Sequence, residues 1–281
     1  MMHTRIVRHG DPESFLRRAS TWLLRTEAEN NLVLGIAARA HAIDELYVAT
    51  VEQDGAVVGC AVRTPPRKLL LTRMPPGAVD ALAIDVAACF DALPGVHGPP
   101  AAAREFARQW CERHGCAARD EMEQRVYALR HVQLPTRMPP GELRFATERE
   151  LGLVVSWIAC FADEARVELP ASREQIAERI AAQQLALWWD EHPRTLAGYG
   201  GRSPNGVRIG PVYTPPEWRG RGYGGACVAA MSRRALDAGA EFCCLYTDLS
   251  NPTSNTLYQR LGYTPVCDAI DIRFVEDAAA A

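Results

Sequence analysis

A glycine-rich turn between an apolar strand and a helix constrains this chain more than any other feature of its sequence. Residues 216–226 read PEWRGRGYGGA, with four glycines inside six positions. Because glycine loses more conformational freedom on folding than any other residue, such a concentration needs a structural reason. A predicted strand at 207–214 precedes the turn, and a predicted helix at 222–238 follows it. The first turn of a helix carries unpaired N–H groups, so the sequence predicts a loop that holds a phosphate or diphosphate.

The spacing of these glycines separates three kinds of phosphate loop. A P-loop is excluded because no Lys-Ser/Thr pair follows the glycines. A Gly-x-Gly-x-x-Gly pattern that begins at Gly220 fits a dinucleotide loop, and Asp248 stands where such a fold needs an acid. However, we expect the strand before the loop to come from a hairpin rather than from a parallel βαβ unit. The third pattern, Arg-x-x-Gly-x-Gly, is matched by Arg219, Gly222 and Gly224.

A second motif follows the glycine turn about 30 residues downstream. The stretch VYTPPEWRGRGYGGACVAAM, followed by NPTSNTLYQRLGYTPV, resembles the GNAT superfamily of acetyl-CoA-dependent N-acetyltransferases. The resemblance lies in the motifs over residues 207–266, in the order of elements over 141–274, and in architecture alone over 1–133. Two motifs in the right order are far more specific than either motif alone.

The resemblance implies a coenzyme A site on the first motif. In the superfamily this loop binds the pyrophosphate through backbone N–H groups, which here implies Arg219, Gly220, Arg221, Gly222, Tyr223, Gly224 and Gly225. We expect the two arginines to add mobile positive charge. The preceding strand splays open in the superfamily and pairs with the pantetheine amides, which implies Val212, Tyr213 and Thr214. An exposed strand edge suits an amide-bearing ligand physically.

The second motif implies two further site residues. Asn251 matches an asparagine that contacts the pantetheine arm, and it equally suits a helix cap before Pro252. Tyr258 matches the tyrosine that protonates the departing thiolate in many members. Its alternative role is that of a core aromatic. A phenol with a pKa near ~10 is protonated at neutral pH, so it can serve as an acid without tuning.

The base that would take the proton from the amine is left open by the sequence. The strand before the loop carries no acid. The candidate carboxylates each have a surface or cap role as the simpler explanation; they are Asp163, Glu164, Glu168, Glu217 and Asp248.

A proline-rich break divides the chain into two predicted α+β domains. The linker at 134–141 separates a domain at 1–133 from a GNAT domain at 142–281. The first domain repeats the order of elements, which favours a duplication. After its corresponding strand it reads PPGAVDALAI, without an Arg-x-x-Gly-x-Gly pattern. We therefore expect a degenerate GNAT-like domain that has lost the pyrophosphate loop, in a tandem GNAT-like acyl-CoA N-acyltransferase fold with a mixed sheet.

Composition removes several other classes of protein. A net charge of −3 does not favour nucleic acid, and no run of 18 apolar residues predicts a membrane span. The N-terminus lacks the apolar segment of a signal peptide. Nine scattered cysteines, with Cys111, His114 and Cys116 the closest group, lack a second pair of metal ligands and indicate free thiols in the cytoplasm. No metal is expected.

The sequence therefore predicts a cytoplasmic N-acetyltransferase that uses acetyl-CoA as co-substrate. A direct attack by the amine of a small-molecule or peptide acceptor is expected, with Tyr258 as the acid. Two alternatives remain: a non-catalytic acyl-CoA-binding sensor or interaction module, and a dinucleotide-dependent oxidoreductase. The identity of the amine and the oligomeric state stay open.

Overall fold

The chain packs into two compact units. The computed structural model describes residues 4–40, 45–167 and 172–276. The first unit comprises Met1–Val126, Tyr246–Asn251 and Pro265–Ala281, and the second comprises Tyr127–Leu245 and Pro252–Thr264.

These packing units do not follow the predicted boundary at 134–141. The last strand, β12 (Thr264–Glu276), pairs antiparallel with β5 (Gly95–Gly98). Ile270 and Ile272 of β12 are almost fully buried in the apolar core of the first unit. A proline-rich segment predicts a break in the local secondary structure. It does not predict that β12, much later in the sequence, pairs with a strand of the first unit.

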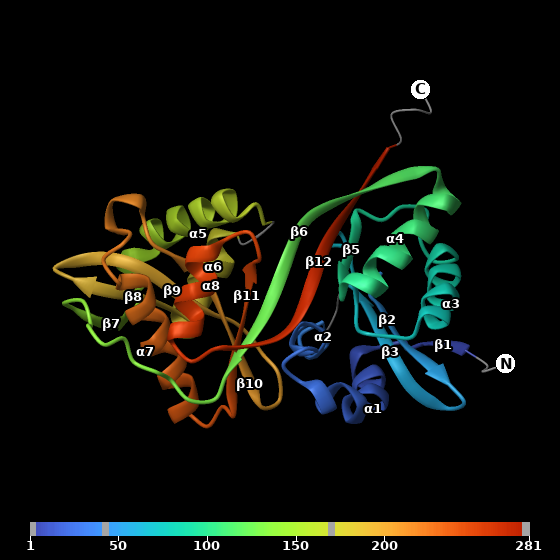
Figure 1. Ribbon diagram of the computed structural model, residues 1–281, viewed down its shortest axis with the longest axis horizontal. Helices are drawn as coiled ribbons and strands as arrows, with labels where there is room; N and C mark the ends of the chain where they lie inside the picture. Colours follow the sequence, from blue (N-terminus) through green and yellow to red (C-terminus); the bar gives the residue numbers. More distant parts are fainter. Residues whose placement is uncertain (1–3, 41–44, 168–171, 277–281) are drawn as a thin grey trace. The chain divides into compact units, whose positions relative to one another are not determined.

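The first unit alternates strands and helices in the predicted order (Figure 1). Its elements are β1 (Thr4–Arg8), α1 (Pro12–Leu23), η1 (Leu24–Thr26), α2 (Asn31–Ala37), β2 (Tyr47–Gln53), β3 (Ala56–Arg63), β4 (Leu69–Leu71), α3 (Pro76–Ala87), β5, α4 (Pro100–His114) and β6 (Cys116–Leu129). The predicted turn at Asp54–Gly55 joins β2 to β3, and both turn residues have positive φ. Asp11 accepts a hydrogen bond from the Ser14 N–H and begins α1.

The second unit is built from the same kinds of elements. They are β7 (Glu142–Phe145), η2 (Glu148–Glu150), α5 (Leu151–Ala165), α6 (Arg173–Ala181), β8 (Leu185–Asp190), β9 (His192–Arg202), β10 (Gly206–Tyr213), η3 (Pro216–Trp218), α7 (Tyr223–Asp237), β11 (Phe242–Asp248) and α8 (Pro252–Arg260). The predicted capping box of Thr147 and Glu150 is confirmed. The hairpin of β9 and β10 turns at the predicted Pro-Asn-Gly.

Two tryptophans show how β8 divides the core of the second unit. Trp188 is 4% exposed and packs in the cluster that contains α7 and α8 residues. Its neighbour Trp189 packs with the cluster that contains α5 and α6 residues, and Arg144 lies over its ring at 5.2 Å. Neighbouring strand residues point to opposite faces, so each tryptophan serves a different layer.

The order of strands and helices along the chain repeats from β7 onward. Each repeat has a first strand, two helices, three antiparallel strands, a third helix, a strand, a fourth helix and a closing strand, although most of the second closing strand, β12, belongs to the first unit. In each unit the strand before the third helix pairs in parallel with the strand after it, β4 with β5 and β10 with β11. This repetition agrees with the duplication expected from the sequence.

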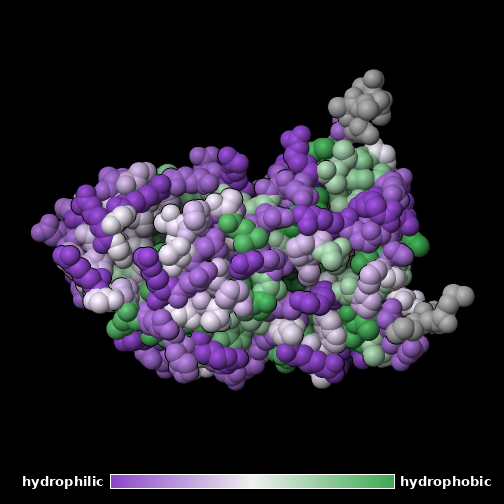
Figure 2. Space-filling view, viewed as in Figure 1, coloured by the Kyte–Doolittle hydropathy of each residue, from purple (hydrophilic) through white to green (hydrophobic). Residues whose placement is uncertain are grey.

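Apolar side chains do not gather on the visible face of the second unit. In Figure 2 the surface on the left is mostly hydrophilic, with small separate apolar areas. The large hydrophobic residues that are exposed in this unit are Leu134 and Met138. Within the described ranges, no helix is long and apolar enough to cross a membrane.

Candidate functional site

Strands β10 and β11 pair over a short distance and then separate. The parallel register runs from Gly206 opposite Phe242 to Arg208 opposite Cys244. The register between β10 and β9 shifts after Arg208, and a Cβ atom added at Gly210 would meet no atom within 4 Å. Strand β10 therefore carries a bulge-like irregularity directly after its recorded pairing with β11 ends.

The predicted pantetheine-contacting residues lie on this separated part of β10 and just after it. Val212 pairs with Ala197 of β9, and Tyr213 pairs with Leu196. The Thr214 hydroxyl shares a hydrogen bond of 2.8 Å with the Thr195 hydroxyl. Their backbone is thus fixed on the β9 side. The recorded pairing with β11 has already ended at Arg208.

One sequence expectation about this strand is wrong. Strand β10 is the second strand of a hairpin, and it is also the first strand of a parallel β10–α7–β11 unit. This topology is common to dinucleotide loops and coenzyme A loops, and the parallel pairing covers three residue pairs.

The glycines of the loop serve two different purposes. Gly220 and Gly222 have φ values of +73° and +85°, a backbone conformation that side chains rarely permit. Gly224 and Gly225 pack closely against their neighbours: a Cβ atom would lie 3.3 Å from the Thr214 hydroxyl oxygen at Gly224, and 2.9 Å from Leu257 Cδ1 at Gly225. The loop therefore brings the start of α7 close to both the end of β10 and helix α8.

The first turn of α7 offers backbone N–H groups without an intrahelical partner. Ala226 N–H donates the first bond of the helix, to the Gly222 carbonyl at 3.0 Å. Gly222, the N-cap residue, supplies no side-chain cap. The N–H groups of Tyr223, Gly224 and Gly225 thus face the end of the helix, where the helix dipole favours an anion.

The two arginines of the loop differ in their contacts. Arg219 donates from Nε to the Thr214 carbonyl at 2.8 Å and from Nη2 to Glu164 Oε2 at 2.6 Å. It is therefore not the mobile charge that we expected from the sequence, because it ties the loop to the end of β10 and to α5. The guanidinium of Arg221 lies 4.9 Å from the ring centre of Trp218 and is exposed.

A buried polar cluster beneath the loop was missed by the sequence analysis. The Tyr223 hydroxyl donates to Asp190 Oδ2 at 2.6 Å, and this bond raises the pKa of Tyr223. Arg194 is 7% exposed, its guanidinium lies 3.7 Å from the ring centre of Trp218, and its Nε has no hydrogen-bond partner among the described atoms. Tyr223 can thus act at the site only through its backbone. Asp190 of β8 and Arg194 of β9 form an ion pair of 3.7 Å, which no periodic pattern in the sequence predicts.

Tyr258 lies on α8 within the apolar cluster that also contains Tyr223 and Ala226. It is 8% exposed, its ring contacts Tyr263 edge to face at 5.9 Å, and burial raises its pKa to about 12. Within the described ranges its hydroxyl has no hydrogen-bond partner. Tyr258 is therefore a core aromatic, as its alternative role required, with a hydroxyl that is still free to donate.

Asn251 immediately precedes α8, which begins with Pro252 as expected. Its N–H donates to the Asp248 carbonyl at 3.1 Å, and Asp248 Oδ1 accepts from the Ser250 N–H at 2.7 Å. A role for Asn251 in ligand binding stays a prediction.

The candidate bases have structural contacts of different kinds. Glu164 accepts from Arg219 and, at 3.4 Å, from the Tyr213 hydroxyl. Glu217 is exposed in η3, and Asp163 lies on α5. Glu168 lies outside the described residues. The structure favours none of them as the base.

No group of three or more His, Cys, Asp or Glu that could hold a metal occurs among the described residues. Cys111 and Cys116 lie close, with their sulfur atoms 3.1 Å apart, and are free thiols like the other seven cysteines.

Known proteins resemble this chain in sequence over one segment and in fold over its whole length. Residues 190–269 match the model of the family described as FR47-like protein. No curated protein shows significant sequence similarity. A GCN5-related N-acetyltransferase from Sphaerobacter thermophilus is 17% identical with a TM-score of 0.59, covering 96% of this chain and 95% of the other.

Two further solved structures extend this likeness. An acetyltransferase of the GNAT family from Colwellia psychrerythraea has a TM-score of 0.59 at 11% identity, over 96% and 98% of the two chains. A tandem GNAT protein from the clavulanic acid biosynthesis pathway has a TM-score of 0.54 at 15% identity, over 97% and 98%. At such identities the likeness establishes the fold. Residues 190–269 thus match the FR47-like family model, and the chain has the fold of tandem GNAT proteins along nearly its whole length.

Proposed function

We propose that this protein is an N-acetyltransferase that transfers the acetyl group of acetyl-CoA to an amine. One observation carries the proposal: β10 separates from β11 directly before a loop whose glycine backbone opens helix α7. A diphosphate and an amide-bearing arm need these two features side by side, a row of N–H donors and an exposed strand edge.

The residues of the loop fit the diphosphate of coenzyme A. Gly220 and Gly222 hold the backbone in conformations that keep the approach free of side chains. The N–H groups at the start of α7 would bind the phosphate oxygens, and Arg221 would add charge at the rim. Arg219 would hold the loop in place through the Thr214 carbonyl. The backbone of Val212, Tyr213 and Thr214 would pair with the pantetheine amides and polarise the acetyl carbonyl.

Tyr258 would act as the acid. In the reaction the amine nitrogen attacks the thioester carbonyl carbon, the carbon–sulfur bond breaks, and the sulfur takes the hydroxyl proton of Tyr258. The amine loses one proton to a base that the residues do not identify. The pKa of about 12 keeps Tyr258 protonated. The same apolar surroundings disfavour a free thiolate, so the sulfur becomes a better proton acceptor there.

The acceptor is proposed as a small-molecule or peptide amine in the cytoplasm. Nine free thiols suit a reducing compartment.

Titration of the purified protein with acetyl-CoA, followed by calorimetry, tests the site. Gly222→Glu should weaken binding roughly 100-fold or more, because the carboxylate takes the place of the diphosphate and repels it. Gly239→Glu is the matched control: Gly239 follows the other end of α7 and has a similar φ of +95°. It introduces the same charge and similar strain, and we expect wild-type affinity.

Two outcomes would contradict the proposal. Wild-type protein that does not bind acetyl-CoA would remove the coenzyme site. Stronger binding of NAD than of acetyl-CoA would favour the dinucleotide reading instead. Melting temperatures of both glutamate variants separate loss of binding from loss of folding.

A further inference from the structure

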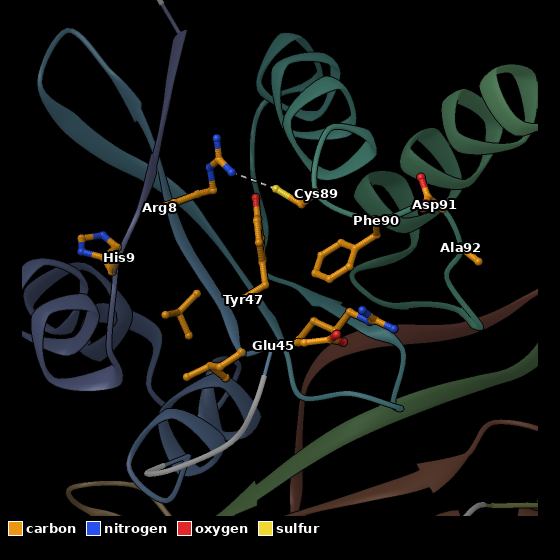
Figure 3. A pocket seen from close by; sticks show the side chains of 11 residues that line it. Arg8, His9, Glu45, Tyr47, Cys89, Phe90, Asp91 and Ala92 are labelled. Atoms are coloured by element: carbon orange, nitrogen blue, oxygen red, sulfur yellow. Dashed lines mark hydrogen bonds between the residues drawn. The ribbon is translucent and has the colours of Figure 1, made fainter.

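The first unit contains a pocket that the proposed acetyl transfer does not use. Its volume is about 570 Å³, within the range of small-molecule sites. It lies at the end of β1, the start of β2, the end of β3 and the segment after α3 (Figure 3). The pocket therefore lies at one end of these strands. The turn between β4 and α3, which corresponds to the proposed coenzyme loop of the second unit, lies at the opposite end.

Arg63 is the unusual member of this pocket. It is 8% exposed, yet it forms no ion pair within the described part of the chain. Its Nε donates to the Arg67 carbonyl at 3.2 Å, and its guanidinium lies 4.3 Å from the ring centre of Phe90. The two terminal nitrogens have no hydrogen-bond partner among the described residues. Neither nitrogen is fully enclosed, so a molecule in the pocket can accept hydrogen bonds from both.

Among the described residues, no other charged group around the pocket lies within ion-pair distance of Arg63. Arg8 stands at the rim and donates to Cys89 Sγ at 3.1 Å, with Asp85 3.5 Å away. Glu45 and Asp91 are exposed, and Glu45 acts on Arg63 from beyond ion-pair distance. Burial lowers the pKa of Arg63, and Glu45 opposes this.

The remaining lining is neutral and largely apolar on one side. His9 bonds to the Thr50 hydroxyl at 3.2 Å, and burial lowers its pKa, which favours the uncharged ring at neutral pH. In Figure 3 the Tyr47 ring stands between Arg8 and Phe90. The Tyr47 hydroxyl is already used, because it donates to Asp85 at 2.8 Å. Tyr47 therefore offers its ring, not its hydroxyl, to a ligand.

We propose that this pocket binds a small organic carboxylate. The two carboxylate oxygens of the ligand accept hydrogen bonds from the terminal nitrogens of Arg63, and the apolar part of the ligand lies against Tyr47 and Leu46. The planar guanidinium matches a planar carboxylate in geometry. A phosphate dianion suits the pocket less, because Glu45 and Asp91 offset the two arginines and leave little net positive charge.

Calorimetric titration of the full chain with benzoate, acetate and 3-phenylpropionate tests the proposal, with benzamide as the neutral counterpart of benzoate. At least one carboxylate should bind, and benzamide should bind at least about 10-fold more weakly than benzoate. Arg63→Gln should weaken carboxylate binding roughly 10- to 100-fold. Arg67→Gln removes an exposed positive charge four residues away that does not line the pocket, and it should leave binding unchanged.

Glu45→Gln distinguishes a carboxylate site from a general effect on folding. It removes the nearby negative charge and should tighten benzoate binding, even if Arg63→Gln destabilises the protein. The proposal is overturned if no carboxylate of the panel binds, if benzamide and benzoate bind equally, or if Glu45→Gln weakens benzoate binding. The coenzyme proposal does not depend on any of these results, since they concern no residue of the α7 loop.

Discussion

The two units share an order of elements, and they differ at the turn that leads into the third helix, between β4 and α3 in the first unit and between β10 and α7 in the second. In the second unit, β10 leaves β11 after Arg208, and Gly220 and Gly222 turn the chain with positive φ into α7. In the first unit, the corresponding turn into α3 contains Pro75 and Pro76, and Gly77 lies already inside the helix.

The strands of the first unit also stay together at the corresponding point. Leu69 and Leu70 pair with Val96 and His97, and a Cβ atom added at Gly98 would lie 2.8 Å from the Leu71 carbonyl oxygen. The hollow at these strand ends is about 20 Å³, room for about one water molecule. The shared topology thus does not by itself support the coenzyme site that we propose in the second unit, which depends on a strand irregularity and a few glycines in special conformations.

The largest effect should come from Tyr258→Phe. This variant tests whether the second unit, unlike the first, carries the chemical step. With an amine that the wild type accepts, the turnover rate should fall roughly 100- to 10,000-fold, while the acetyl-CoA affinity stays unchanged. The acid works in its protonated form, and its pKa is about 12. At any pH below about 11, deprotonation of Tyr258 should therefore not reduce the wild-type rate. Steady-state kinetics across pH and calorimetry measure both quantities.

Tyr199→Phe is the matched control for this variant. Tyr199 is a tyrosine of the same unit whose hydroxyl donates to the Met231 carbonyl at 3.1 Å, and we expect its loss to spare the rate. Equal rates for Tyr258→Phe and the wild type would exclude Tyr258 as the acid.

A smaller effect is expected from Gly98→Ala, which places a methyl group between the paired strands β4 and β5 of the first unit. The methyl group would meet backbone at Leu71, and backbone yields less readily than a flexible side chain. The free energy of unfolding should decrease by roughly 1–3 kcal/mol. Denaturant unfolding measures this change, and acetyl-CoA affinity at low temperature should not move. A neutral result would mean that the two strands can separate as β10 and β11 do.

The smallest effect is expected from Gly77→Ala. No atom lies within 4 Å of a Cβ atom at Gly77, and its φ is not positive. Alanine should raise the free energy of unfolding by about 0.5–1 kcal/mol, as in other exposed helix positions. Gly222→Ala, measured beside it, should destabilise because of its φ of +85°. Destabilisation by Gly77→Ala would show that the turn of the first unit depends on its glycine too.

Local signals allowed much of this fold to be predicted. The Thr147 capping box, the Asp54–Gly55 turn and the end of α7 before Gly239 each depend on neighbouring residues, and each is confirmed. The glycine motif also lies in one continuous stretch, so its position between strand and helix could be predicted.

Features that depend on distant residues could not be predicted. The ion pair of Arg219 with Glu164 joins residues 55 positions apart, and the pairing of β12 with β5 joins segments more than 170 positions apart. The stacking of Arg194 on Trp218 depends on how β9 faces the loop. Composition and periodicity carry no information on such partners, and the exact contacts of the site consist largely of them.

The placement of β12 has a consequence for biosynthesis. A ribosome delivers the N-terminal half of a chain first, and domains usually fold in that order. Here Ile270 and Ile272, made more than 170 residues after β5, complete the apolar core of the first unit. The nascent first unit therefore cannot finish its core until β12 has left the exit tunnel, by which time the residues of the second unit have also been made.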